Sequence, residues 1–123
     1  MVEIGQTHTS QLTVTEGLTA QAMGSGDLPV LATPAMLALM ENAAMLAVAA
    51  HLPEGCTTVG GHIASSHLKP SNIGDTVTAT ATVTHVEGKK IKFKVEAHSG
   101  DTLIGEGTHL RFIIDIKRFM SNL

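Results

Sequence analysis

The chain has 123 residues, of which 43% are hydrophobic and 15% charged, and this predicts one globular domain over residues 1–123 rather than a disordered segment. Its net charge of −3 and its lack of Trp and Tyr exclude a broad basic surface for duplex nucleic acid and the base-stacking platforms of single-strand binders. Only 2% of the residues are aromatic, so the core has to be built from small side chains, and the limited burial that results favours an oligomer.

The N-terminal residues contain no basic region followed by an apolar run, so we expect no secretory signal peptide. The only cysteine, Cys56, has no partner for a disulfide within the chain. Both features predict a cytoplasmic protein rather than a secreted, disulfide-stabilised one. Within the N-terminal region, Gln11–Thr15 is a plausible first strand.

The longest apolar stretch, Leu28–Leu52, predicts a buried helix rather than a membrane span, because Glu41 lies near its middle, where a charge is costly in a bilayer. Thr33 is suited to the N-cap and Pro34 to the first helical position, and Ala, Leu and Met dominate the following turns. A proline and a glycine after residue 51 would end the helix, which we therefore expect over Pro34–His51. Since it is apolar on nearly all sides, it should be covered on most of them.

The remainder of the chain is typical of strands joined by tight turns. Between residues 76 and 85, threonines alternate strictly with mostly small apolar residues, which gives one Thr-rich face and one small apolar face. The strands are expected at Thr57–Lys69, Thr76–His85, Lys90–Val95 and Leu103–Ile116. Because tight turns connect antiparallel neighbours, the chain predicts an α+β fold in which one long helix lies across a five-stranded antiparallel sheet.

Three segments carry a more specific signal. Residues 31–41 are LATPAMLALME, residues 60–67 are GGHIASSH, and residues 107–115 are GTHLRFIID. Together they resemble the fluoroacetyl-CoA thioesterase family of hotdog-fold enzymes, and a weaker similarity extends from about Gly5 to the C-terminus. The resemblance implies the hotdog fold, in which a curved sheet wraps a long central helix.

The resemblance also implies hydrolysis of an acyl-CoA thioester at a site in the interface of a homodimer, or of a tetramer. By their positions in the matching segments, Thr33, Glu41 and His67 would form the catalytic group. Gly60 would lie near the thioester carbonyl, and Arg111 would support the acidic and basic residues. No cofactor is expected beyond the coenzyme A that forms part of the substrate.

Glu41 is informative through its own chemistry. A carboxylate in the middle of an apolar helix is costly to bury unless it is paired or protonated, and a desolvated carboxylate can act as a base toward water or as a nucleophile. The alternative is a structural glutamate tied to Arg111 or to backbone donors. For Thr33, helix capping alone would be a sufficient explanation. Regular helix would separate Thr33 from Glu41 by about 12 Å, so either the chain folds back at Thr33 or the two residues that meet come from different subunits.

His67 lies on an expected strand beside small polar residues, and an imidazole titrates near neutral pH. We therefore hypothesise that His67 and Glu41 activate Thr33 or a water molecule, while a backbone N–H near Gly60 stabilises the oxyanion. The chain contains seven histidines, but His62 and His67 would face opposite sides of a regular strand, and there is no His-Glu-x-x-His helix or cysteine pair. We expect no metal site.

Both the acyl group and the activity admit alternatives. The fluoroacetyl enzyme has a longer segment before the helix with a Phe over the pocket, whereas Gly24–Pro29 is short and lacks Phe, so another short acyl group is equally compatible. The Asp-to-His spacing of hotdog enoyl-CoA hydratases is missing. The chain could instead be a non-catalytic module that binds or senses acyl-CoA. A row of lysines is expected to be a solvated strand face or to contact coenzyme A phosphates: Lys90, Lys92 and Lys94.

Overall fold

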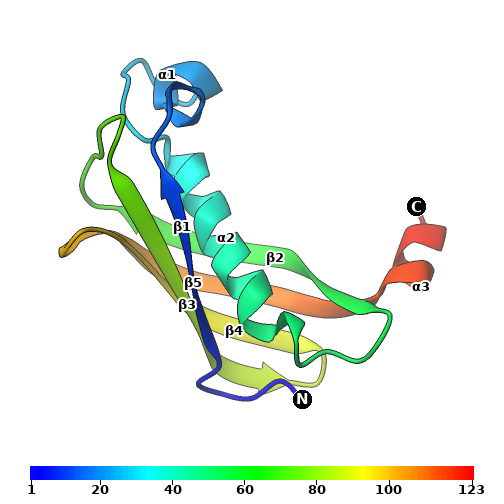
Figure 1. The fold of residues 1–123 in the computed structure, drawn as a ribbon. Coiled ribbons are helices and arrows are strands. Elements are labelled where there is room, and N and C mark those ends of the chain that lie inside the picture. The colour runs from blue at the N-terminus through cyan, green and yellow to red at the C-terminus, as the bar shows by residue number, and fades with distance from the viewer.

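In a computed structural model, which describes residues 1–123, a curved sheet wraps one long helix (Figure 1). The strands are β1 (Thr7–Thr13), β2 (Cys56–His67), β3 (Thr76–Glu87), β4 (Lys90–Ser99) and β5 (Thr102–Asp115). The helices are α1 (Ala20–Met23), α2 (Thr33–Ala49) and α3 (Ile116–Ser121), with one short 3-10 helix, η1 (Glu16–Leu18). The expected α+β arrangement of one central helix and five antiparallel strands is confirmed.

Neighbouring strands of the sheet are all antiparallel, in the order β1-β3-β4-β5-β2. Two hairpins connect the three central strands. Each turns at a glycine in the left-handed region, Gly88 (φ 59°) or Gly100 (φ 58°), a conformation that residues with a Cβ rarely adopt. β1 and β2 form the edges, so one side of the β2 backbone has no strand partner within the chain.

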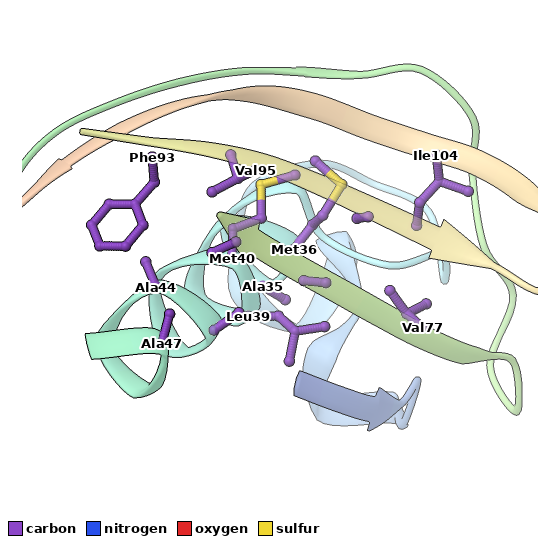
Figure 2. Packing of buried hydrophobic residues seen from close by; sticks show 14 of the residues in the cluster. Ala35, Met36, Leu39, Met40, Ala44, Ala47, Val77, Phe93, Val95 and Ile104 are labelled. Carbon is purple, nitrogen blue, oxygen red and sulfur yellow. The ribbon is translucent and has the colours of Figure 1, made fainter. Parts of the chain in front are cut away.

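The core lies between α2 and the concave face of the sheet. The side chains of β3 that face α2 are small, and Val77, Ala79 and Ala81 have no exposed surface. Figure 2 shows that α2 presents mainly alanines and two methionines to this face of the sheet. Phe93 of β4 is the one aromatic side chain in the cluster. Small side chains on both sides let the helix approach the sheet closely, as the alternation in β3 predicts.

The first strand differs from its predicted position. It is Thr7–Thr13 rather than Gln11–Thr15, because its threonines pair with those of β3. The Oγ1 atoms of Thr9 and Thr80 are 2.7 Å apart across this pair, on the outer face of the sheet. Cross-strand hydroxyl pairs of this kind stabilise the register, and a scan of the first strand alone does not reveal them.

α2 spans Thr33–Ala49 rather than Pro34–His51. Its N-cap is Ala32, whose backbone is extended and whose carbonyl oxygen accepts from the N–H of Met36 (3.1 Å). The prediction that Thr33 caps the helix is therefore wrong: Thr33 is the first helical residue. The short elements α1, η1 and α3 are not predicted from the sequence. None of the helices has the length and apolarity needed to cross a membrane.

Candidate active site

Thr33 and His67 meet where the start of α2 lies beside the end of β2. The Oγ1 atom of Thr33 is 2.8 Å from Nδ1 of His67, so one hydrogen bond joins them. Thr33 is exposed, and the end of β2 is held by the N–H of Leu68, which donates to the carbonyl of Ile104 (2.7 Å). The hydroxyl can give its proton to Nδ1 whenever that nitrogen carries a lone pair.

The surroundings of His67 favour its neutral form. Burial of the ring, the larger effect, lowers the pKa of His67 below its ordinary value of 6.5, and the backbone of Lys69 offsets part of this shift. The Nε2 atom is buried and makes no hydrogen bond of good geometry. A neutral imidazole beside a hydroxyl is the arrangement that general-base activation requires.

Thr33 and His67 also line a surface cavity of about 320 Å³. Its walls come from the segment before α2 and the segment after β2. The other lining residues are Ala20, Ser25, Val30, Leu31, Leu68, Lys69 and Pro70. Ser25 belongs to Gly24–Pro29, so the segment that the sequence singles out for pocket shape does border the cavity. A cavity of this volume lies at the small end of ligand sites.

Glu41 lies apart from this pair, beside Arg111. Its Oε2 atom is 3.6 Å from Nη1 of Arg111. The arginine side chain is only 7% exposed, whereas that of Glu41 is 44% exposed. Glu41 is thus partly exposed in the single chain, because the carboxylate sits over Gly60 of the edge strand β2 and is not covered there. Glu41 does contact Arg111, a contact that suits a structural and a catalytic glutamate equally.

Because Gly60 has no Cβ atom, the Glu41 carboxylate can occupy the space beside it. A Cβ atom at Gly60 would lie 2.8 Å from Oε2 of Glu41, closer than such contacts occur. The next residue, Gly61, is the extra residue of a β-bulge between Gly60 and His62. The two glycines at this bulge therefore let the Glu41 carboxylate and the Phe112 ring lie close to the backbone of β2.

Arg111 is fixed by two residues that sequence reasoning misses, Thr58 and His109. Its Nε donates to Oγ1 of Thr58 (2.8 Å), its Nη2 donates to the Thr58 carbonyl (3.0 Å), and its Nη1 is 3.2 Å from Nε2 of His109. Burial lowers the pKa of Arg111, and the charge of Glu41 opposes that shift. His109 stands two residues before Arg111 on one strand face, a spacing that is visible in the sequence. Thr58 lies diagonally across the strand pair, which only the register reveals.

The predicted site residues thus form two groups within the chain. Thr33 contacts His67, and Glu41 contacts Arg111 above Gly60. No hydrogen bond or ion pair joins the two groups. Since α2 is helical from Thr33 onward, Glu41 stands about 12 Å from Thr33 along the helix axis. The alternative in which the chain folds back at Thr33 is therefore wrong.

Comparison with known proteins gives consistent matches. A family model described as fluoroacetyl-CoA-specific thioesterase matches residues 14–117. A curated fluoroacetyl-CoA thioesterase from Streptantibioticus cattleyicolor is 40% identical over 90 residues, which make up 73% of this chain and 65% of that protein. The match therefore spans slightly less than two thirds of that relative.

Solved structures extend the similarity to the whole fold. A structure of the fluoroacetyl-CoA thioesterase FlK superposes with a TM-score of 0.91 at 32% identity, over 99% of this chain and 95% of that one. A thioesterase superfamily member from Thermus thermophilus gives a TM-score of 0.92 at 26% identity, over 99% and 90%. A hot-dog-like protein from Thermanaerovibrio acidaminovorans, at 24% identity, shares the fold with a TM-score of 0.87, over 97% and 88%. The expected hotdog fold is confirmed.

Proposed function

Because the chain belongs to the fluoroacetyl-CoA-specific thioesterase family, we propose that it hydrolyses the thioester of a short-chain acyl-CoA to the free acid and coenzyme A. The observation that carries the proposal is the 2.8 Å contact between Thr33 Oγ1 and His67 Nδ1 beside a cavity of about 320 Å³. A hydroxyl bonded to a neutral imidazole is a proton-transfer pair of the kind that acyl transfer uses.

Thr33, Glu41 and His67 form the catalytic group of the proposed reaction. A water molecule, activated by Glu41 or through Thr33 and His67, adds to the thioester carbonyl carbon, and one of its protons goes to the base. The C–S bond then breaks, and the base that accepted this proton returns it to the leaving thiolate. The N–H of Gly60 donates to the developing oxyanion, while Arg111 orients the Glu41 carboxylate from 3.6 Å.

The two groups of site residues come together, in our proposal, across a homodimer interface. The free edge of β2 is available for strand pairing, and this strand carries Gly60 and His67. If the β2 strands of two copies pair antiparallel about a two-fold axis between Ile63 and Ala64, His67 of one copy lies opposite Gly60 of the partner subunit. The imidazole would then face the carboxylate that sits above that glycine.

Release of free thiol from acetyl-, fluoroacetyl-, propionyl- and longer acyl-CoAs tests the activity. We expect hydrolysis of short acyl groups, with rates that decline as the acyl chain outgrows the cavity. His67→Ala should lower kcat by about 10²-fold or more, the contribution of a general acid–base group. If no thioester is hydrolysed, the enzyme proposal is wrong. Acyl-CoA that raised the unfolding temperature without hydrolysis would support the binding-module alternative.

Complementation of two inactive variants tests the shared site. In a mixed dimer of Glu41→Gln and His67→Ala, one of the two shared sites keeps both native residues, whereas a site built within one chain would always lack one of them. Refolding the two variants together should therefore restore about a quarter of the wild-type specific activity through random pairing. Mixed samples that stay as inactive as each variant alone would contradict the shared site.

A further inference from the structure

His109 is a buried histidine to which the proposed reaction assigns no role. It is 2% exposed, lies on β5, and stacks on the ring of Phe93 with 6.1 Å between centroids. Its Nδ1 is 2.7 Å from the carbonyl oxygen of His62, and its Nε2 is 3.2 Å from Nη1 of Arg111. Both ring nitrogens therefore have a partner inside the chain.

These two contacts determine which nitrogen of His109 carries the hydrogen. A guanidinium only donates hydrogen bonds, so Nε2 must hold a lone pair and accept from Nη1 of Arg111. A carbonyl oxygen only accepts, so Nδ1 must carry the hydrogen that it donates to His62. His109 is therefore a neutral imidazole with its hydrogen on Nδ1.

The acceptors that fix Arg111 are uncharged. They are the hydroxyl and carbonyl oxygens of Thr58 and the Nε2 atom of His109. Glu41 is the one carboxylate in contact, at 3.6 Å, and it bonds to nothing else in the chain. These three neutral contacts fix the orientation of the guanidinium group. Because none of them carries a negative charge, they do not compensate the positive charge, and Glu41 is its one charged partner.

We propose that His109 is a positioning residue, which as a neutral acceptor fixes the guanidinium of Arg111 and through it the Glu41 carboxylate above Gly60. Protonation of the ring removes the acceptor and brings a second cation to 3.2 Å from Nη1 of Arg111, where the two charges repel. The expected effect on rate rests on the proposed thioesterase function, whereas the expected effect on Arg111 does not.

The surroundings of His109, chiefly its burial, oppose its protonation near neutral pH. The titratable groups that act on its pKa are His62 on β2, Arg111 on β5 and Glu41 on α2. His85 on β3 and Lys92 on β4 border the same surface cavity as His109, and Phe93 of β4 stacks on its ring. Burial is the largest effect and lowers the pKa of His109, and the charge of Arg111 lowers it further. The hydrogen bond to His62 and the charge of Glu41 act in the other direction without reversing the shift. The arrangement is thus intact at neutral pH and is released in acid.

Two substitutions at this position separate the two contacts. The amide oxygen of Gln can take the place of Nε2 and keep an acceptor for Arg111, whereas the amide nitrogen of Asn can take the place of Nδ1 and keep only the donor to His62. We expect His109→Asn to lower kcat for thiol release roughly tenfold with KM within about twofold, because the lost bond involves a charged group. His109→Gln should stay within about threefold of the wild-type kcat and lose the acid-side inflection that His109 contributes.

Side-chain NMR gives a second readout that needs no substrate. Nitrogen spectra of the wild type at neutral pH should show His109 protonated on Nδ1 alone, and the Nε–H of Arg111 should exchange slowly with water. Protection of this hydrogen, measured against an unstructured arginine at the same pH, should fall in His109→Asn and also in the wild type on acidification, but acid should not lower it in His109→Gln. If His109→Asn fails to fold, the acid response of the wild type against His109→Gln makes the same comparison.

Each outcome decides one of the two proposals. A hydrogen on Nε2 of His109, or an unchanged kcat and unchanged Arg111 exchange in His109→Asn, would overturn the positioning role. A wild type that hydrolyses no acyl-CoA would overturn the proposed function instead, and the exchange of the Arg111 Nε–H would still decide what His109 does.

Discussion

At the scale of a single residue, the position of Thr33 in α2 determines which partner its hydroxyl bonds to. A threonine at the N-cap would accept hydrogen bonds from the helix amides, but Ala32 occupies that position. One residue further on, the hydroxyl of Thr33 bonds to Nδ1 of His67 instead. Its contribution to the stability of α2 should therefore be small, and its contribution to catalysis large.

Thr33→Ala tests this separation. We expect thiol release to fall by about 10²-fold or more, while the free energy of unfolding in urea changes by less than about 0.5 kcal/mol, against the ~1 kcal/mol of a lost cap. Thr33→Ser keeps the hydroxyl and serves as the matched control for activity. Full activity of Thr33→Ala together with a cap-sized loss of stability would assign Thr33 a structural role only.

His67 and His109 should make stability depend on pH. Burial lowers the pKa of each below the ordinary value of 6.5, so between the folded-state values and 6.5 the unfolded chain binds more protons than the folded one. The contribution of both rings to stability therefore rises with pH through this interval and levels off above 6.5. Urea unfolding from about pH 5 to pH 8 measures the slope, which His109→Gln should reduce. A stability that fell with increasing pH over this interval would contradict the prediction.

Sequence reasoning reaches some of these residues and misses others for physical reasons. Glu41 and Arg111 stand out individually, one as a charge in an apolar helix and the other through its segment, and they do pair. His109 and Thr58 carry no such mark, because their contacts depend on strand register and on the bulge at Gly61. The exposure of Glu41 could not be predicted from the sequence either, because apolar neighbours do not reveal which side of a helix lies over a sheet edge.

At the scale of elements, a close approach between β2 and β5 supports the site. A Cβ atom at Gly107 on β5 would collide with the backbone of Ala64 and Ser65 on β2. β2 carries Gly60 and His67, so the spacing of these two strands determines where both groups of site residues stand. A glycine at position 107 is therefore a requirement of the strand pair rather than of a turn.

Gly107→Ala should force the two strands apart locally. We expect a loss of about 1–3 kcal/mol in the free energy of unfolding, because the atoms in the way are backbone atoms that cannot rotate aside. Thiol release should also decrease as β2 shifts. Gly17→Ala is the control, since a Cβ there meets nothing within 4 Å. Equal urea midpoints for the two variants would show that β2 and β5 can accommodate a Cβ atom at position 107 without loss of stability.

Length and periodicity decided which elements were predictable. α2 has 17 residues, and the 12 residues of β3 include strict alternation over residues 76–85, so both gave signals that survive errors at the ends. α1 and α3 have 4 and 6 residues, too few for a helical period to repeat. The position of β2 at the sheet edge follows from the pairing of all five strands, which no single segment encodes.

At the scale of the whole molecule, the small core and the uncovered β2 edge favour assembly. Only 27 of the 123 residues are buried in the single chain, and Phe93 is the only Phe, Tyr or Trp among them. Pairing of two β2 edges would cover further surface and complete both proposed sites. Folding and dimer formation should then be linked.

A linked dimer should become more stable as its concentration rises. We expect the urea midpoint to increase when the protein concentration is raised about a hundredfold, because the dissociated chain lacks the interface that stabilises the folded state. Light scattering at the same concentrations reports the mass. A monomeric mass with a midpoint independent of concentration would rule out the dimer and, with it, the shared site.

The close contact of α2 with β3 has a consequence for how substrate range could change in evolution. None of the four surface cavities of the single chain is lined by the buried residues of α2. Opening a cavity along the helix by shortening core side chains would cost stability in a core that is already rich in alanine. A change in acyl preference should therefore arise most readily from substitutions in the segments around Ser25 and Lys69, which border the cavity and can vary without destabilising the core.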